Sequence, residues 1–270
     1  MFRAAFDYCS NIVRFYGGVN MQRREKRELR EKEIVETTIR LLSQRGFLDL
    51  RMADIAKETS YSMGTIYSHF ESKEDLLVAC AYALILEHKV LFNAIGSQPI
   101  SAIEKIITTA QCSWQISMRH PDLIEIDNLS LMPSVWRRAT KQRANELNLL
   151  HVELAQLFLG IVHEAIETSL NGYDQLDQPQ IEQLANYLTH GMWGLCVGLS
   201  STAQSGYAST LCPDSGDESD RYFATNYTNF LKGYGWREEN PEAVFAQCKG
   251  IAQACMDQTT WFSASREQSS

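Results

Sequence analysis

The sequence predicts an all-α fold, because apolar side chains recur at intervals of three and four residues along most of the 270-residue chain. No segment alternates between apolar and polar residues for long enough to predict a strand. Helix caps, glycines and prolines stand at the boundaries of the periodic segments. A chain of this length can build one large domain or two modest domains with a substantial core.

Both ends of the chain are expected to lie outside the fold. Residues 1–20 hold aromatic side chains and a Gly-Gly pair, but show neither a helical period nor an apolar run of signal-peptide form. Met21 begins a charged amphipathic segment and is a more natural start for the fold. Residues 1–20 are therefore predicted to be a disordered extension, and residues 263–270 a disordered tail.

Residues 21–80 are predicted to contain four helices, of which the first and last are long. The first runs from about 22 to 45 and ends at Gly46, and its inner face is Ile34, Thr38, Leu41 and Leu42. The last begins after the capping residue Ser72 and continues to about Asn93. This long helix would join the first part of the chain to the rest.

The two short helices between them are predicted to form a helix-turn-helix. Met52, Ile55 and Ala56 make one face of the first short helix apolar, and a turn over residues 59–62 follows. The second short helix buries Ile66 and Phe70, and its opposite side consists of Ser62, Met63, Gly64, Thr65, Tyr67, Ser68 and His69. Hydroxyls, an imidazole and bare backbone suit phosphate oxygens and base edges, so we expect this helix to enter a DNA major groove.

These residues resemble the DNA-binding domain of the TetR (tetracycline-repressor-like) family of bacterial regulators. The resemblance covers about residues 25–80, and its motifs are Ile34–Gly46 with Phe47, Asp54-Ile55-Ala56, Ser62-x-Gly64-Thr65-Ile66-Tyr67-x-x-Phe70 and Ser72-Lys73-Glu74-x-Leu76-Leu77. Ser60 departs from the family pattern, which usually has Gly in the turn, and would be strained if its φ is positive. Met63 stands where a polar residue is common.

The resemblance implies a role for each residue of the exposed face. Tyr67, His69 and Lys73 would hold backbone phosphates, assisted by Ser62 and Thr65, and Arg51 would hold a further phosphate at the start of the first short helix. Base edges would face Met63, Gly64 and Ser68. Gly64 lets the backbone approach the groove closely, and Met63 can contact a thymine methyl group.

The distribution of charge fits a specific nucleic-acid binder better than a nonspecific one. Residues 21–80 hold eleven Lys or Arg and eleven Asp or Glu, whereas residues 81–270 hold twelve against twenty-one. An acidic chain argues against nonspecific coating of nucleic acid. Basic residues cluster at the start of the first helix, either as a DNA-facing edge or as a solvated face of acid–base pairs such as Glu28–Lys32.

Residues 81–262 are predicted to form a helical ligand-binding and dimerisation domain. Further helices are expected over about 101–119, 133–171, 179–199, 220–233 and 241–258, with a loop at 200–219. Three glycines within the helix at 179–199 predict a close helix crossing or room for a ligand. The resemblance favours a two-fold, four-helix dimer interface there, formed by Leu184, Leu188, Gly191 and Leu195.

Large and deformable apolar side chains gather in the same part of the chain. Most are expected to be core, and some to line a pocket for a hydrophobic or amphipathic effector: Trp114, Met118, Met132, Trp136, Met192 and Trp193. We expect no metal site, no cofactor and no catalytic residues, because the six histidines are scattered and no hydrolase, phosphate-loop or zinc motif occurs. Seven cysteines without a CxxC pair indicate reduced thiols in a cytoplasmic protein, and no apolar run predicts a membrane span.

The sequence therefore favours a homodimeric, ligand-responsive transcriptional regulator that binds a palindromic operator, most simply as a repressor. The alternative is a helical interaction protein that keeps the DNA-binding head but responds to a protein partner instead of a small molecule. A change of operator affinity on binding a small molecule would separate the two. The effector, the operator sequence and the sign of regulation do not follow from the residues.

Overall fold

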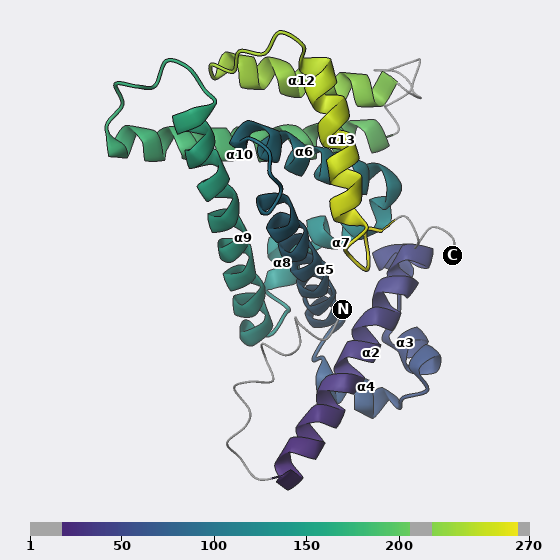
Figure 1. Cartoon of the computed structure of the whole chain (residues 1–270). Coiled ribbons are helices and arrows are strands. Elements are labelled where there is room, and N and C mark those ends of the chain that lie inside the picture. The colour runs from purple at the N-terminus through teal and green to yellow at the C-terminus, as the bar shows by residue number, and fades with distance from the viewer. Residues whose placement is uncertain (1–17, 206–217, 264–270) are drawn as a thin grey trace.

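The computed structural model describes residues 18–205 and 218–263 of the chain, which form helices and no strands (Figure 1). The helices are α2 (Gly18–Asp49), α3 (Met52–Thr59), α4 (Met63–His69), α5 (Lys73–Gly96), α6 (Ala102–Arg119), α7 (Pro121–Ser130), α8 (Pro133–Trp136), α9 (Lys141–Thr168), α10 (Gln178–Gln204), α12 (Glu218–Gly233) and α13 (Pro241–Met256). One isolated bridge joins Leu170 to Trp236. The all-α prediction is confirmed.

The first helix differs from its predicted limits at both ends. α2 begins at Gly18, so three residues of the predicted extension are helical, while residues 1–17 lie outside the described part. Its regular course breaks at Gly46, where φ is 72° and ψ is 169°. Glycine adopts this left-handed φ without steric cost, so the regular helix is interrupted at the predicted stop, and α2 then continues to Asp49.

Helices α2, α3 and α4 form a head at the lower right of Figure 1, and α5 leads from this head into the remaining bundle. Ile34, Ile55, Ile66 and Phe70 are fully buried in one hydrophobic cluster, which continues along α5. The head therefore shares its core with the connecting helix. A change in the packing of α5 would reach the head directly.

A second hydrophobic cluster lies under α6, α9, α10, α12 and α13, at the upper end of the molecule in Figure 1. It is rich in aromatic rings: Trp114 stacks on Phe223 with 4.9 Å between ring centroids, and Tyr227 and Phe245 pack edge-on or tilted beside them. The Trp114 indole N–H donates a 2.6 Å hydrogen bond to Asp220. This stacking and hydrogen bond anchor α12 to α6.

The segment predicted as one helix from 133 to 171 is two helices. α8 ends at Trp136, and Thr140 then caps α9, its hydroxyl accepting a hydrogen bond from the Arg143 N–H. The helix α7 was not predicted; its first turn begins with Pro121, directly after the helix expected over about 101–119. The loop expected at 200–219 begins later, since α10 continues to Gln204, and its residues 206–217 lie outside the described part.

The helix α9 carries an apolar surface that the protomer does not cover. Leu149, Val152 and Leu157 are 63%, 45% and 39% exposed. α9 is also the one helix of the described residues that is long and apolar enough to span a membrane, by length and composition alone. The sequence was expected to contain no apolar run long enough to span a membrane, and α9, which includes charged residues, meets the test by length and composition only. A surface of this kind usually marks contact with another molecule.

Candidate nucleic-acid interface

Two buried side chains fix the orientation of α4. Ile66 and Phe70 point into the head and are fully buried, so the opposite side of this short helix faces solvent. Ser62 caps the helix: its hydroxyl oxygen accepts a 3.0 Å hydrogen bond from the Thr65 N–H. The Ser68 hydroxyl donates to the Thr65 carbonyl at 2.7 Å. The amphipathic pattern of the sequence therefore predicted this helix and its direction correctly.

The exposed side of α4 brings together most of the residues expected to contact DNA. Tyr67 is 50% exposed and Met63 is 39% exposed, and the other exposed members of this face are Ser62, Gly64 and Ser68. Thr65 is half-buried beside them. A Cβ atom at Gly64 would meet only the Ser62 hydroxyl, at 3.7 Å, so the backbone is open to a close approach there. No carboxylate belongs to this face.

His69 is the exception, and its expected place on the exposed face was wrong. Its side chain is only 3% exposed, and its Nδ1 lies 3.3 Å from the Glu31 carboxylate of α2. The spacing of the sequence places His69 close to the boundary between the two faces of a short helix. Contact with Glu31, which is 38 residues away in the chain, turns the ring inward. His69 therefore supports the head from inside and drops out of the set of DNA contacts.

Lys73 is only partly accessible. Its amine donates a hydrogen bond to the Phe47 carbonyl and lies 4.1 Å from the centroid of the Phe47 ring. Burial lowers the pKa of the Lys73 amine. The amine thus satisfies a carbonyl at the end of α2 in this structure, and a phosphate contact would need to replace that bond.

Arg51 and Arg27 are two exposed cationic residues of the head. Arg51 precedes α3 and is exposed, and its backbone N–H donates to the Asp54 carboxylate at 3.2 Å. Arg27 of α2 donates to the Ser68 carbonyl at 3.0 Å, which ties α4 to α2. No local sequence pattern indicated the Arg27 contact, because the two residues are 41 positions apart.

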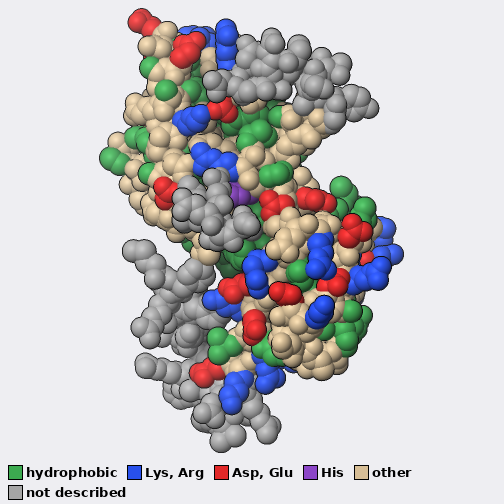
Figure 2. Space-filling model, turned by 90° about the vertical axis from the view of Figure 1, so that its right-hand side faces the viewer, with side chains coloured by type: hydrophobic (Ala, Val, Ile, Leu, Met, Phe, Trp, Pro, Cys, Tyr) green, Lys and Arg blue, Asp and Glu red, His purple; other side chains and the backbone are tan. Residues whose placement is uncertain are grey.

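The head surface mixes both signs of charge. In the lower part of Figure 2, which contains the head, blue Lys and Arg side chains alternate with red Asp and Glu. Arg24 pairs with Glu28 at 2.8 Å and Lys32 with Glu36 at 3.7 Å along α2. The basic cluster of the sequence is therefore partly a solvated face of i,i+4 ion pairs, as one of its two interpretations held.

Ser60 in the turn has a positive φ of 58°. Glycine, which the family pattern usually has at this position, adopts such a φ without strain. Ser60 is the one residue other than glycine with positive φ among residues 18–205 and 218–263. The Cβ atom makes this conformation unfavourable for serine. The expected strain at this position is thus present in the structure.

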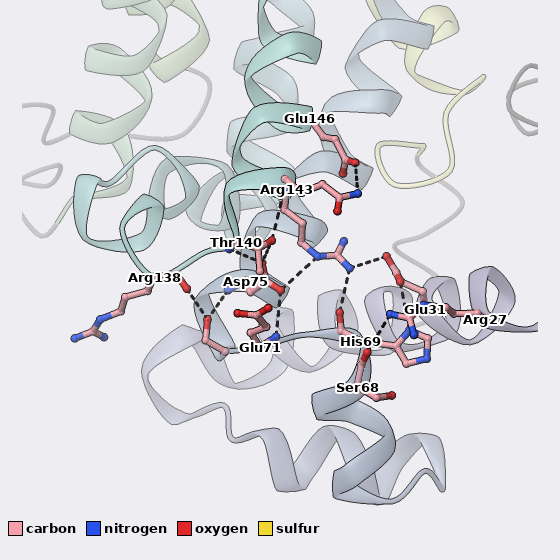
Figure 3. Close-up of polar contacts among 12 residues, drawn as sticks. Arg27, Glu31, Ser68, His69, Glu71, Asp75, Arg138, Thr140, Arg143 and Glu146 are labelled. Carbon is pink, nitrogen blue, oxygen red and sulfur yellow. Dashed lines mark hydrogen bonds and ion pairs between the residues drawn. The ribbon is translucent and has the colours of Figure 1, made fainter. Parts of the chain in front are cut away.

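A polar cluster fixes the end of α4 against the bundle (Figure 3). Arg143 of α9 reaches Glu31, Asp75 and the His69 carbonyl. Asp75 is 1% exposed, and its carboxylate accepts hydrogen bonds from the Thr140 N–H and hydroxyl at 2.9 and 2.8 Å. Sequence reasoning missed these residues, because their side chains meet only in the folded chain.

The residues expected to line an effector pocket do not converge on one cavity. Trp114 and Met192 are each 2% exposed within the second hydrophobic cluster, and Met118 packs against it. Trp136 packs against the first cluster, while Met132 and Trp193 are on the surface, 49% and 60% exposed. The six residues divide between two hydrophobic clusters and the surface, because helical spacing does not specify which core a side chain joins, and which of them line a pocket stays a prediction.

The residues expected at a dimer interface mostly face their own protomer. Leu188 is 1% exposed in the second hydrophobic cluster, and Leu184 and Leu195 pack against the same cluster. A Cβ atom at Gly191 would lie 2.6 Å from the Phe230 ring of α12, so this glycine serves a close crossing within the chain. Leu188 and Gly191 are therefore corrected to core positions.

The side of α10 opposite Leu188 is exposed to solvent. Tyr187, Trp193 and Val197 are 58%, 60% and 39% exposed, and no atom lies within 4 Å of a Cβ built at Gly194 or Gly198. Exposed aromatic residues and glycines thus share one surface of α10. Gly191 therefore serves a helix crossing within the chain, whereas Gly194 and Gly198 lie on the open surface of α10.

The amino-terminal part of the chain matches a known family. Residues 34–80 match the model of bacterial regulatory proteins of the tetR family. The uncharacterized HTH-type transcriptional regulator YuxN of Bacillus subtilis (strain 168) is 30% identical over 131 residues, which cover 46% of this chain and 44% of that protein. YerO, another uncharacterized regulator of this type from the same strain, is 43% identical over 83 residues, 29% of each chain. The matches thus span less than half of these curated relatives.

The fold likeness extends over most of the chain. A putative transcriptional regulator from Saccharomonospora viridis, solved in complex with choline, superposes with a TM-score of 0.55 and 20% identity over 78% of this chain and 100% of its own. At that identity the likeness concerns the fold. The family match falls on α2 to α5, the helices that build and orient the exposed face of α4. Residues 34–80 therefore resemble the amino-terminal part of bacterial regulatory proteins of the tetR family, and the likeness over the rest of the chain is one of fold.

Proposed function

We propose that this protein binds a palindromic operator as a homodimer and that a small hydrophobic or amphipathic effector weakens this binding, so that it acts as a repressor. The observation that carries the proposal is the exposed face of α4, where Met63, Gly64, Tyr67 and Ser68 project without a carboxylate. A face of hydroxyls, an apolar tip and open backbone is complementary to base edges and phosphates.

Each group of this face has a distinct part in the proposal. Met63 and Ser68 lie next to base edges, with Met63 contacting a thymine methyl group. Tyr67, Thr65 and the exposed Arg51 contact phosphates and thereby set the register of the helix in the groove. Lys73 joins them only if its amine leaves the Phe47 carbonyl.

The homodimer is proposed from the uncovered apolar surfaces of two long helices that pack against each other. α9 exposes Leu149 and Val152, and α10 exposes Tyr187, Trp193 and Val197. Two copies of this surface can pair as a four-helix layer, a common arrangement for symmetric dimers. Palindromic DNA then matches the two-fold axis, with one head on each half-site.

The effector is proposed from the second hydrophobic cluster and from the fold. A regulator of the same fold was solved with choline, so this architecture can hold a small molecule. The aromatic side chains around Trp114 and Phe223 offer apolar and π surfaces to such a ligand. The two rings pack together in this structure, so a ligand would have to separate them.

The test follows operator affinity and tryptophan emission in one sample while apolar and amphipathic compounds are added. The proposal predicts that at least one compound changes the emission and weakens operator binding together, by about 5- to 150-fold. A compound that binds without affecting operator affinity would contradict the effector role. Operator binding that responds to no compound in a broad panel would favour the alternative of regulation by a protein partner.

A further inference from the structure

Arg143 in the first turn of α9 is the centre of the polar cluster that joins α9 to the head (Figure 3). Its Nη2 lies 2.8 Å from the Glu31 carboxylate of α2, and its Nε lies 3.4 Å from the Asp75 carboxylate of α5. The same Nη2 donates to the His69 carbonyl at 3.2 Å. One side chain of the bundle therefore contacts α2, α5 and the last residue of the recognition helix.

The contact with the recognition helix has two parts. His69 ends α4, and carbonyls at a helix C-terminus lack partners within the helix, so the Arg143 bond satisfies one of them. The guanidinium carbon also lies 4.6 Å from the centroid of the Phe70 ring, which is fully buried directly after α4. Arg143 thus holds the C-terminal end of α4 by a hydrogen bond and by stacking on a ring.

In this cluster, the orientation of α4 depends on Arg143 more than the folding of the chain does. Asp75 keeps three other hydrogen bonds, from the Thr140 N–H, the Thr140 hydroxyl and the Glu71 N–H. Glu31 is 30% exposed, so water can solvate its carboxylate if the arginine is removed. Without Arg143, α4 would keep its buried side chains but lose its direct polar link to α9.

We propose that Arg143 is a positioning residue for DNA binding, which sets the orientation of α4 from the first turn of α9. This inference rests on the proposed function only in that α4 is taken to read DNA. α9 also carries the apolar surface around Leu149 and Val152, beginning less than two turns after Arg143. A displacement of α9 at that surface reaches α4 through Arg143, without a tilt of the connecting helix α5.

The chain provides a matched control in Arg138. Its guanidinium pairs with Glu74 at 2.6 Å and so crosses the same junction between the α8–α9 turn and α5. Its side chain is 70% exposed, and none of its observed contacts reaches α4. Arg138→Met therefore removes an arginine and an ion pair from the junction but leaves the contacts of α4 intact.

The experiment compares the full-length wild type with Arg143→Met, Arg143→Lys and Arg138→Met. The dissociation constant is measured for a DNA site selected by the wild type and for random DNA at one salt concentration. Hydrogen exchange is followed in peptides covering residues 60–72. We expect Arg143→Met to weaken specific binding by about tenfold, about 1.4 kcal/mol, and to leave phosphate-driven binding to random DNA unchanged.

The other variants and the exchange data complete the expected pattern. Lysine lacks the planar fork of arginine, so Arg143→Lys should lie between the wild type and Arg143→Met. Exchange over residues 60–72 should accelerate in Arg143→Met and stay at the wild-type rate in Arg138→Met. An Arg143→Met protein with wild-type circular dichroism, wild-type exchange and an unchanged ratio of specific to random-DNA affinity would overturn the inference.

Two further results keep the inference separate from folding and from the proposed function. If Arg143→Met does not fold, Glu31→Gln removes the charge from one partner of Arg143 at a partly exposed site, and it should reduce the same affinity ratio and accelerate the same exchange. Unchanged values for Glu31→Gln would then overturn the inference. If the wild type selects no DNA sequence, the proposed function fails, and the exchange comparison alone decides whether Arg143 orders α4.

Discussion

At the scale of single residues, Ser60 stands where the family pattern usually has glycine, and its positive φ is expected to lower the stability of the folded protein. It is exposed and has a left-handed backbone conformation, so no side-chain contact offsets the strain. Glycine is favoured at such a position after a helix because it lacks the Cβ atom that causes the strain. Its strain was predictable from the sequence, because the turn of a helix-turn-helix is short and demanding in geometry.

Ser60→Gly should stabilise the protein by about 1 kcal/mol, after allowing for the greater chain entropy of glycine in the unfolded state. The free energy of unfolding can be measured by urea titration of both proteins. Ser62→Ala is the matched control in the same turn, and it should destabilise by about 1 kcal/mol because it removes the α4 cap. A lower stability of Ser60→Gly would show that the turn does not hold the left-handed conformation.

Substitutions of Met63 and Tyr67 should distinguish a residue that recognises bases from one that contacts a phosphate. Met63→Gln should change the preferred base pair at one symmetric position in each half-site, with differences of about 1–3 kcal/mol per pair. Tyr67→Phe should weaken all sites nearly equally, since a phosphate contact carries no sequence information. Sites selected from a random library with each variant give both results. An unchanged preference in Met63→Gln would remove Met63 from the base-reading residues.

His88 of α5 should make stability depend on pH. Burial lowers the pKa of His88 from 6.5 to about 4, its Nδ1 donates to the Leu84 carbonyl at 3.1 Å, and its ring packs edge-on against Phe262. Below about pH 6.5, His88 becomes protonated in the unfolded chain but stays neutral in the folded chain. The contribution of His88 to the free energy of unfolding therefore falls as the pH drops toward 4.

The comparison with His88→Gln isolates this contribution. Glutamine can also donate a hydrogen bond but takes up no proton, and the nearby His151 is present in both proteins. Between about pH 7 and about pH 5 the wild type should lose about 1–2 kcal/mol more unfolding free energy than the variant. Equal losses in urea titrations would mean that His88 keeps an ordinary pKa in the folded protein.

His69 and Lys73 show where residue-level prediction stops. The helical period placed Met63, Gly64, Tyr67 and Ser68 on the exposed face correctly, because that face is set by the burial of its opposite side. The orientation of His69 depends on Glu31, and that of Lys73 on the Phe47 carbonyl. Such partners from distant parts of the chain leave no periodic signal.

At the scale of elements, helices with clear caps were predictable and short connections were not. Ser72 caps α5, as the sequence predicts, and Ser101, where the next helix was expected to begin, caps α6. The separation of α8 from α9 depends instead on Thr140, whose backbone N–H and hydroxyl bind Asp75 across the junction with the head. A tertiary contact thus fixes the start of α9, which periodicity alone assigns to one longer helix.

The two sides of α10 should respond differently to a new charge. Val197→Glu places a carboxylate on the exposed surface proposed for the dimer and should give a folded monomer with weaker operator binding. Leu188→Glu places it in a core position with 1% exposure and should unfold the protein or destabilise it by several kcal/mol. Analytical sedimentation and circular dichroism distinguish these outcomes. A dimeric Val197→Glu protein with wild-type affinity would place the interface on another surface.

At the scale of the whole molecule, the sequence predicted the architecture of the head better than the interior of the bundle. Only about residues 25–80 carry motifs, and there the local pattern, the turn and the caps all agree. In the bundle, Trp114 belongs to the second hydrophobic cluster, whereas Trp136 packs against the first. The sequence does not distinguish these two tryptophans. Composition identifies core material, but only the three-dimensional packing assigns it to a site.

The whole molecule also suggests how the head and bundle act together. The first hydrophobic cluster runs from the head along α5, and the Arg143 cluster connects the end of α4 to α9. α5 and α9 pack side by side, so both connections lead to the same pair of helices. A change at the apolar surface of α9 can therefore reach the head through the shared core along α5 and the C-terminal end of α4 through Arg143.

The central claim, that the exposed face of α4 reads a two-fold symmetric operator, is tested most directly by selecting bound sequences from a random double-stranded DNA library with the full-length protein. The claim predicts enrichment of two identical half-sites in inverted orientation, with centres separated by about one helical turn of DNA or a multiple of it. A selected pool that matches the starting library, or that holds a single half-site without its symmetric copy, would contradict it.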